Sequence, residues 1–242
     1  MAKEIEKEKK GILYLIPNSL GDASLQSIFP DHNKAVIAGL STFITENLKS
    51  ARRFLKKVNR DIDIDALTFH ILDEHTLVEE TRQYLDDTLS GKDVGLLSEA
   101  GTPCIADPGS IIVRRAHLLG IRVIPLIGPN SLILALMASG FNGQQFVFHG
   151  YLPIPGRERY NKIREIEKQV WQHNQTQLFI ETPYRNIAMF EALLKTCRED
   201  TELCIACNIT LEDEYISTRS IREWKNEQPD LHKKPAVFLL YK

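Results

Sequence analysis

Short apolar runs alternate with longer amphipathic runs through the first half of the chain, and this alternation constrains the fold most. Five short runs bounded by Gly, Pro or charge predict buried strands: Ile12–Ile16, Ala35–Gly39, Ala66–Ile71, Val94–Leu97 and Ile121–Ile127. Three amphipathic runs predict helices between them: Phe43–Val58, Thr76–Leu89 and Ser110–Leu119. Thr76 and Glu79 have the spacing of a helix-starting capping box. Alternating strands and helices predict an α/β fold with a parallel sheet and right-handed crossovers.

The pattern changes after Gly128. An Ala/Leu-rich segment, Ser131–Ser139, predicts a helix that Gly140 ends. Two further helices are predicted at Arg157–Trp171 and Asn186–Cys197, and five strands at Phe146–Tyr151, Gln177–Glu181, Leu203–Asn208, Tyr215–Thr218 and Ala236–Tyr241. Because the strands cluster toward the end, we expect a mixed sheet with helices. We therefore place two α/β domains at residues 1–127 and 128–242.

Composition narrows the class of protein. The 242 residues suit one large domain or two small ones, and the net charge of −2 gives no overall preference for nucleic acid. No apolar run is long enough to span a membrane, and no signal peptide is recognisable. Four cysteines in a chain this long are too few for a disulfide framework, so we expect a cytoplasmic protein. The charged run Met1–Lys10 is expected to be a solvated tail.

Three Gly/Pro-rich loops follow predicted strands: Pro17–Asp22, Ser98–Gly109 and Gly128–Ser131. Glycine lets a ligand approach the backbone closely, and proline fixes the shape of a loop in advance. Parallel strands end at the same edge of a sheet, where ligands of open α/β folds bind. The loops therefore predict a ligand site. The chain has neither the G-x-G-x-x-G motif nor a P-loop, which disfavours a standard dinucleotide or nucleoside triphosphate site.

Other motifs admit a plainer interpretation. Glu181–Arg185 is either a simple strand terminus or a wall of the same ligand site. Cys204 and Cys207 form a C-x-x-C without a second ligand pair, which favours buried structural cysteines over metal binding. For the polar cluster of His70, Asp73, Glu74 and His75, a hydrophilic connection is favoured over a metal site.

Two predicted helices are rich in basic residues. One carries Lys49, Arg52, Arg53, Lys56 and Lys57, and the other carries Arg157, Arg159, Lys162, Arg164 and Lys168. Solvated helix faces are the usual explanation for such runs. The alternative is a track for the phosphate backbone of a nucleic acid.

An ordered set of motifs resembles a known family. Ser98-Glu99-Ala100-Gly101-Thr102-Pro103 with Asp107-Pro108-Gly109 resembles the S-D-A-G-T-P…D-P-G motif of the tetrapyrrole-methylase superfamily. The similarity is greatest to the branch that 2′-O-methylates a ribose of small-subunit ribosomal RNA. It extends to Leu13–Asp22, Ile124–Ser131, Ala138–Gly140, Phe148–Pro153 and Glu181–Arg185.

The resemblance implies a two-domain methyltransferase that uses S-adenosylmethionine and no metal. It implies a homodimer, with small-subunit ribosomal RNA as a possible partner and no membrane association. The cofactor is expected in a cleft between the domains. The implied cofactor contacts are Gly101, Thr102, Pro103, Ile105, Gly128, Asn130, Ser131 and Ile180. Methyl transfer requires mainly that donor and acceptor be aligned, which fits such backbone-rich loops.

The chain departs from the ribosomal branch near the expected acceptor. Thr45–Lys49 stands where that branch has A-E-D-T-R, Ala206–Thr210 stands where it has A-R-E-L-T, and Glu99 stands where Asp is usual. A small-molecule (tetrapyrrole-like) methyltransferase, or a cofactor-binding relative without catalysis, are therefore alternatives. A hydroxyl acceptor needs a base. Glu46 and Glu181 are the catalytic candidates, and Asp22 and Arg185 are expected to shape the pocket.

Overall fold

The computed structural model describes residues 9–242, so residues 1–8 of the predicted tail Met1–Lys10 lie outside the described part. The chain divides into two compact units, residues 1–129 and 130–242. We call them the first and second unit. The predicted domain boundary, after residue 127, falls close to this division.

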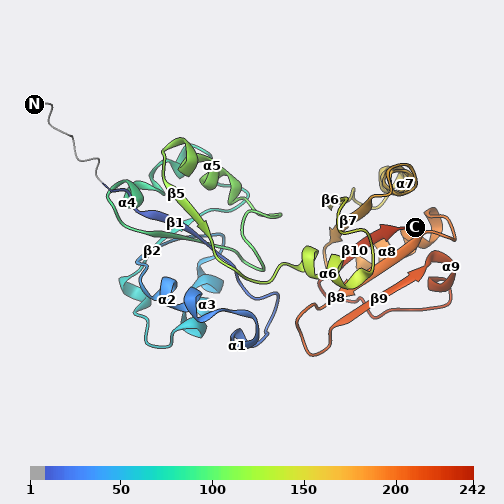
Figure 1. Ribbon diagram of the computed structural model, residues 1–242, viewed down its shortest axis with the longest axis horizontal. Helices are drawn as coiled ribbons and strands as arrows, with labels where there is room; N and C mark the ends of the chain where they lie inside the picture. The colour runs from blue at the N-terminus through green and yellow to red at the C-terminus, as the bar shows by residue number, and fades with distance from the viewer. Residues whose placement is uncertain (1–8) are drawn as a thin grey trace, which may run out of the picture. The chain divides into compact units, whose positions relative to one another are not determined.

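The first unit is built on a parallel five-stranded sheet, as the alternating pattern predicts (Figure 1). Its strands are β1 (Ile12–Ile16), β2 (Thr42–Thr45), β3 (Thr68–Ile71), β4 (Val94–Leu97) and β5 (Arg122–Pro125). Their order is β3-β2-β4-β1-β5, and each neighbouring pair is parallel. The carboxyl ends of β1, β4 and β5 therefore lie next to one another at one edge of the sheet.

Helices cover both faces of this sheet (Figure 1). Side chains from α1 (Leu25–Ile28), α2 (Asp31–Ala38) and α3 (Leu48–Val58) pack on one face together with Phe43 and Leu97. On the other face, α5 (Ser110–Leu118) and the segment leading into α4 (Asp86–Leu89) pack with Ile44 and Leu96. Adjacent strand residues thus enter opposite cores, as expected for strands buried on both faces.

The predicted strand Ala35–Gly39 is wrong, because this segment belongs to helix α2, which buries Asn33 and Ile37. The second strand lies instead at Thr42–Thr45 and overlaps the start of the predicted helix Phe43–Val58. Helix α3 begins only after Asn47, whose side chain accepts hydrogen bonds from the Lys49 and Ser50 amides. This cap fixes the helix start and leaves the β-branched residues before it to pair in the sheet.

The predicted helix Thr76–Leu89 is also wrong. The segment forms turns, a 3₁₀ helix at Glu80–Gln83 and the short helix α4. The Thr76 hydroxyl is hydrogen-bonded to the amide and the carboxylate of Asp73, both at 2.9 Å, rather than capping a helix. Such local side-chain bonds compete with helical ones. A capping box does occur elsewhere, at Ser220 and Glu223.

The second unit contains a mixed five-stranded sheet, as predicted, in the order β6-β7-β10-β8-β9. Strand β6 (Phe146–Tyr151) runs parallel to β7 (Thr176–Glu181). Strand β10 (Ala236–Tyr241) is antiparallel to β7 and to β8 (Glu202–Cys207), and β9 (Tyr215–Ser220) is antiparallel to β8. The start of β10 therefore lies beside the end of β7.

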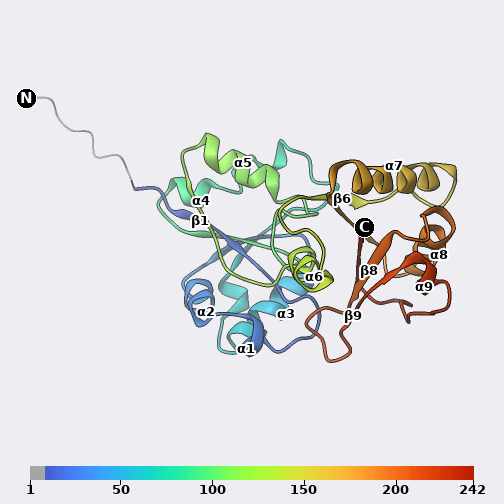
Figure 2. The same cartoon turned by 45° about the vertical axis from the view of Figure 1, so that its right-hand side comes forward.

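Helices also lie on both sides of the second sheet (Figure 2). Helix α6 (Ser131–Ser139) packs on β8, β9 and β10. The core on the opposite face joins the sheet to α7 (Arg157–His173), α8 (Asn186–Thr196) and α9 (Ile221–Trp224). Across residues 9–242, no helix combines the length and apolarity that a membrane crossing requires.

Candidate functional site

The three Gly/Pro-rich loops of the first unit meet at the carboxyl edge of its sheet. Asn18, after β1, and Gly101, after β4, form a two-way backbone bridge with N–O distances of 2.8 and 3.1 Å. The buried Asn18 amide also donates to the carbonyls of Ser98 and Glu99 at 3.2 and 3.1 Å. Because β1 lies between β4 and β5, the loop after β1 holds the loop after β4 in place.

The loop after β5 is packed just as closely against the loop after β1. A Cβ atom placed on Gly128 would lie 2.3 Å from Cγ of Pro17, so only glycine fits here without moving the backbone. A Cβ on Gly101 would lie 3.3 Å from the Pro129 carbonyl oxygen, and Gly101 has a φ of +67°. Glycine at these two positions is thus required for the three loops to approach one another.

The loop after β4 is folded around the Asp107 carboxylate. Its Oδ1 accepts from the amides of Cys104 and Gly109 at 2.8 and 2.9 Å, and its Oδ2 accepts from the Ser98 hydroxyl at 3.3 Å. Cys104 and Ala106 adopt left-handed backbone conformations with φ of 68° and 60°. Strain of this kind persists only where the surroundings impose it, and it clusters at functional sites.

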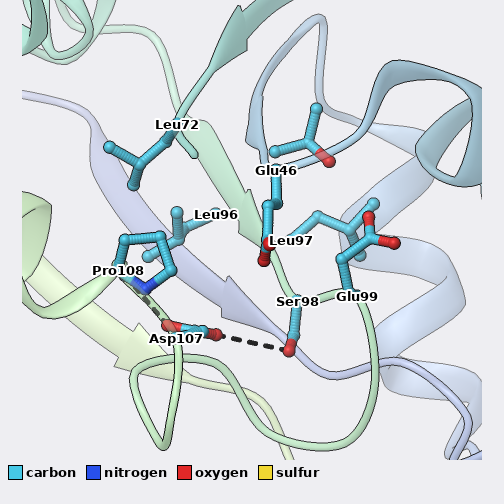
Figure 3. A pocket seen from close by; sticks show the side chains of 10 residues that line it. Glu46, Leu72, Leu96, Leu97, Ser98, Glu99, Asp107 and Pro108 are labelled. Atoms are coloured by element: carbon cyan, nitrogen blue, oxygen red, sulfur yellow. Dashed lines mark hydrogen bonds between the residues drawn. The ribbon is translucent and has the colours of Figure 1, made fainter. Parts of the chain in front are cut away.

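A small polar pocket lies at the adjoining end of β2 (Figure 3). Its volume is about 10 Å³, enough for one water molecule, and its lining includes Glu46, Ser98, Glu99 and Asp107. Thr45 of β2 pairs with Leu97 of β4, so Glu46 follows directly beside Ser98. Partial burial raises the pKa of Glu46, and the negative charges of Glu99 and Asp107 raise it further. A carboxylate with a raised pKa is a better proton acceptor than an ordinary one.

A wider groove of about 450 Å³ adjoins the same edge, between the loop after β1 and helix α3. Asn18, Asp22, Arg53, Lys57 and Glu99 are among the residues that line it. Asp22, predicted to shape a pocket, accepts from Lys57 at 2.9 Å, and this contact lowers its pKa. All five basic side chains of α3 are exposed, and the helix has no acidic residue.

The predicted contacts differ in exposure. In the first unit, Gly101 and Pro103 are buried, Thr102 and Gly128 are partly buried, and Ile105 is 47% exposed. In the second unit, Asn130 caps helix α6 by accepting from the Ile133 amide at 3.0 Å. Ser131 begins that helix, and Ile180 is a partly buried residue of β7. The structure brings the first group together at one sheet edge.

Glu181 has a different environment from the one expected of a catalytic base. Its carboxylate is fully buried and accepts from Arg159 at 2.6 Å and from Arg185 at 2.7 and 2.9 Å. It also accepts from the Thr182 amide at 2.7 Å. A carboxylate held by two guanidinium groups is poorly placed to accept a substrate proton, so this geometry favours a structural role.

Arg159 corrects another expectation. It was predicted to lie on a basic, solvent-facing helix, but its side chain is only 1% exposed and pairs with Glu181. Burial lowers the pKa of its guanidinium, and the Glu181 charge opposes that effect. Nothing within the basic run Arg157–Lys168 distinguishes Arg159 from its neighbours, because its partner Glu181 lies on strand β7 and not on the same helix.

The remaining motifs are structural. Cys204 and Cys207 are buried, and burial raises the pKa of each thiol to about 11. His70 stacks on Tyr84 with ring centroids 4.7 Å apart, while Asp73 closes a turn with Thr76. Among residues 9–242 no group of three or more His, Cys, Asp or Glu side chains is placed to hold a metal ion.

Comparison with known proteins agrees with this architecture. The family described as Tetrapyrrole (Corrin/Porphyrin) Methylases matches residues 34–224. The ribosomal RNA small subunit methyltransferase I of Vibrio cholerae is 30% identical over 95% of this chain and 77% of the relative. The protein of that name from Bacillus subtilis is 29% identical over 91% of this chain and 72% of the relative. The crystal structure of the methyltransferase CobJ matches 96% of this chain and 94% of that chain, with a TM-score of 0.63 and 16% identity.

Parallel strands with glycine-dependent loops at their carboxyl edge define an α/β enzyme with a ligand site at that edge. The chain belongs to the tetrapyrrole (corrin/porphyrin) methylases, and it is a methyltransferase. The family resemblance identified from the sequence motifs is thereby confirmed. The structure also assigns a role to Asn18 and Asp107, whose hydrogen bonds hold the loop after β4. Both lie within the quoted motifs, but the sequence did not indicate this role.

Proposed function

We propose that this chain transfers a methyl group from S-adenosylmethionine to a ribose 2′-hydroxyl of small-subunit ribosomal RNA. The observation that carries the proposal is the similarity, along nearly the whole chain, to proteins named ribosomal RNA small subunit methyltransferase I. A homodimer and a cytoplasmic location stay predictions.

The loops after β4 and β5 are the proposed donor-binding elements. Their fit to the donor is supported by a closely packed backbone in which Gly101 and Gly128 leave no room for side chains. When bound, S-adenosylmethionine supplies a methyl group on a sulfonium sulfur. A nucleophile attacks this methyl group, and the sulfur is the leaving atom. Gly101, Thr102, Pro103, Ile105 and Gly128 would hold it from the first unit, and Asn130, Ser131 and Ile180 stay predicted contacts from the second.

Glu46 is the proposed general base. Its carboxylate stands at the end of β2, beside the loop after β4, and its pKa is raised by partial burial and by neighbouring carboxylates. It would accept the proton of the ribose hydroxyl as the oxygen attacks the methyl group. The buried pair of Glu181 with Arg159 supports assigning this step to Glu46 rather than to Glu181.

Helix α3 supports an RNA acceptor. Lys49, Arg52, Arg53, Lys56 and Lys57 form an exposed basic face beside the 450 Å³ groove. Of these, only Lys57 forms an ion pair with a described residue. Unpaired basic side chains are available to phosphate groups, and phosphate contacts position RNA without selecting its sequence.

Transfer of a labelled methyl group tests the proposal. Purified protein is incubated with methyl-labelled S-adenosylmethionine and either deproteinised small-subunit ribosomal RNA or a small-molecule extract. We expect label in the RNA with the wild-type chain, and strongly reduced label with Ser131→Trp, which obstructs the predicted donor contact. Label confined to the small-molecule fraction would favour the tetrapyrrole-like alternative. A folded protein that binds donor but labels nothing would favour a relative without catalysis.

A further inference from the structure

A second cluster of apolar and basic side chains, of which Arg159 is buried and the others are exposed or partly exposed, lies at the carboxyl end of β7 within the second unit. We call Ile154, Arg159, Tyr184, Arg185 and Lys233 the Tyr184 cluster. Three segments supply it: the connection from β6 to α7 with the first turn of α7, the connection from β7 to α8, and the turn that precedes β10. Strand pairing brings these segments together, because β6 is parallel and β10 antiparallel to β7.

Hydrogen bonds fix the three segments to one another. The Lys233 amide donates to the Pro183 carbonyl at 3.3 Å, and the Asn186 side chain donates to the Lys234 carbonyl at 2.6 Å. The Arg159 Nη2 atom donates to the Glu181 carboxylate at the end of β7 at 2.6 Å, and its Nε donates to the Pro153 carbonyl within its own segment at 2.8 Å. Lys233 itself has a φ of 57°, a left-handed conformation that is costly for a residue with a side chain. The turn before β10 thus holds Lys233 in a strained backbone conformation, and such strain is common in functional segments.

The cluster has an excess of positive charge. Two guanidinium groups, Arg159 and Arg185, share the single buried carboxylate of Glu181. The Nη1 atom of Arg159 is buried and has no hydrogen-bond partner among residues 9–242. Asp213 and Asp230 both pair with Lys234 and offset part of this charge, but the four cations Arg159, Arg185, Lys233 and Lys234 still exceed the three carboxylates Glu181, Asp213 and Asp230 by one. The Arg185 side chain is 34% exposed, so the uncompensated charge is presented where an anion from solution can reach it.

The same surface exposes an aromatic ring. Tyr184 is 77% exposed and Ile154 is 72% exposed, so both side chains are open to solvent. The Lys233 ammonium lies 5.9 Å from the centroid of the Tyr184 ring. Tyr184 therefore offers an exposed ring beside the Lys233 ammonium, and Arg185 follows it directly in the chain.

We propose that the Tyr184 cluster binds one nucleotide of single-stranded RNA, with its base stacked on Tyr184 and its phosphate beside Arg185 and Lys233. Unpaired bases in RNA are recognised by stacking on aromatic side chains, and adjacent cations pair with the backbone. The inference rests on the proposed RNA acceptor. It adds a contact that positions the acceptor strand through the second unit, apart from the basic face of α3 in the first.

Binding of a fluorescein-labelled, unstructured 12-nucleotide RNA tests this contact by anisotropy. Tyr184→Ala removes the ring and is expected to weaken RNA binding by about fivefold or more, the usual effect of losing one stacked base. Tyr184→Phe keeps the ring and should bind within about twofold of wild type. Tyr215→Ala is the matched control, because Tyr215 is also exposed, at 39%, but lies on β9 away from the cluster.

Lys233→Gly tests the charge without adding strain, because glycine adopts the left-handed conformation freely. It is expected to lower the slope of log affinity against log salt by about 0.7, the value for one phosphate contact to a single strand. Calorimetry with S-adenosylhomocysteine should give the wild-type affinity for the Tyr184 and Lys233 variants.

The outcomes separate the two proposals. Equal RNA affinity for wild type, Tyr184→Ala and Lys233→Gly overturns the inference, as does a loss of S-adenosylhomocysteine binding without a change in RNA binding. Wild-type protein that labels RNA while Tyr184→Ala labels it equally well at subsaturating RNA also overturns the inference but leaves the proposed function standing. Wild-type protein that neither binds nor labels RNA overturns both.

Discussion

Replacing Glu181 with Gln tests the role of the buried ion pair. The change preserves the shape of the side chain but removes the charge that compensates Arg159. The Arg159 side chain is 1% exposed and that of Glu181 is 0% exposed, so solvent cannot screen the unpaired guanidinium. Breaking a buried pair in this way costs about 3–5 kcal/mol. Arg185 adds little to this estimate, because it is 34% exposed and keeps its hydration.

Urea unfolding followed by tryptophan fluorescence measures this cost. Both tryptophans of the chain, Trp171 and Trp224, lie in the second unit, so the signal reports the unit that contains Glu181. A loss of about 3 kcal/mol lowers the urea midpoint by about 2 M at a slope of about 1.5 kcal/mol/M. Glu191→Gln, an exposed change on helix α8, is the control and should leave the midpoint within about 0.3 M.

Adding Arg159→Met to Glu181→Gln should restore part of the lost free energy of unfolding, because the second change removes the unpaired charge. A Glu181→Gln variant with the wild-type midpoint and strongly reduced methyl transfer would refute this reasoning. It would show that Glu181 acts in catalysis and that its pairing contributes nothing to stability.

Three further predictions address the sheet edge and the acceptor side. Gly128→Ala places a Cβ atom 2.3 Å from Pro17 and should weaken S-adenosylhomocysteine binding by about tenfold or more, measured by calorimetry, whereas Gly143→Ala, which meets nothing within 4 Å, should not. Because Glu46 must be deprotonated to act as a base and its pKa is raised, the methyl-transfer rate should increase as the pH rises through a pKa above that of an ordinary carboxyl group. Glu99→Gln removes a neighbouring negative charge and should move that midpoint to lower pH, and Glu46→Gln should abolish it; a pH profile unchanged in both variants would exclude Glu46 as the base. Arg53→Ala on helix α3 should reduce the salt dependence of RNA binding, whereas Arg222→Ala, whose side chain pairs with Glu199, should leave it as it is.

Local sequence predicted the strands that carry the loops after β1, β4 and β5. The runs that became β1, β4 and β5 are short and apolar, and glycine and proline follow each of them within a few residues. Their common edge followed from parallel pairing alone. The close packing of the loops after β1 and β5 could not be predicted in this way. It depends on the pairing of β1 with β5, which places Pro17 where a Cβ atom on residue 128 would lie.

The errors fell where local signals conflict. Ala35–Gly39 is a short apolar run whose periodicity fits a buried strand or a buried helix. In the structure it belongs to helix α2, which packs Ile37 into the core. Arg159 shows a different kind of failure. Its basic neighbours indicate a solvated face, whereas its burial depends on Glu181, which is contributed by a separate strand. The Tyr184 cluster likewise depends on β10 running antiparallel to β7.

A crystal structure with bound S-adenosylhomocysteine tests the central claim most directly. We expect the ligand at the carboxyl edge of β4, β1 and β5, with backbone contacts from Gly101–Pro103 and a close approach to Gly128. A ligand held elsewhere on the chain, with the loops after β4 and β5 free of contact, would contradict it.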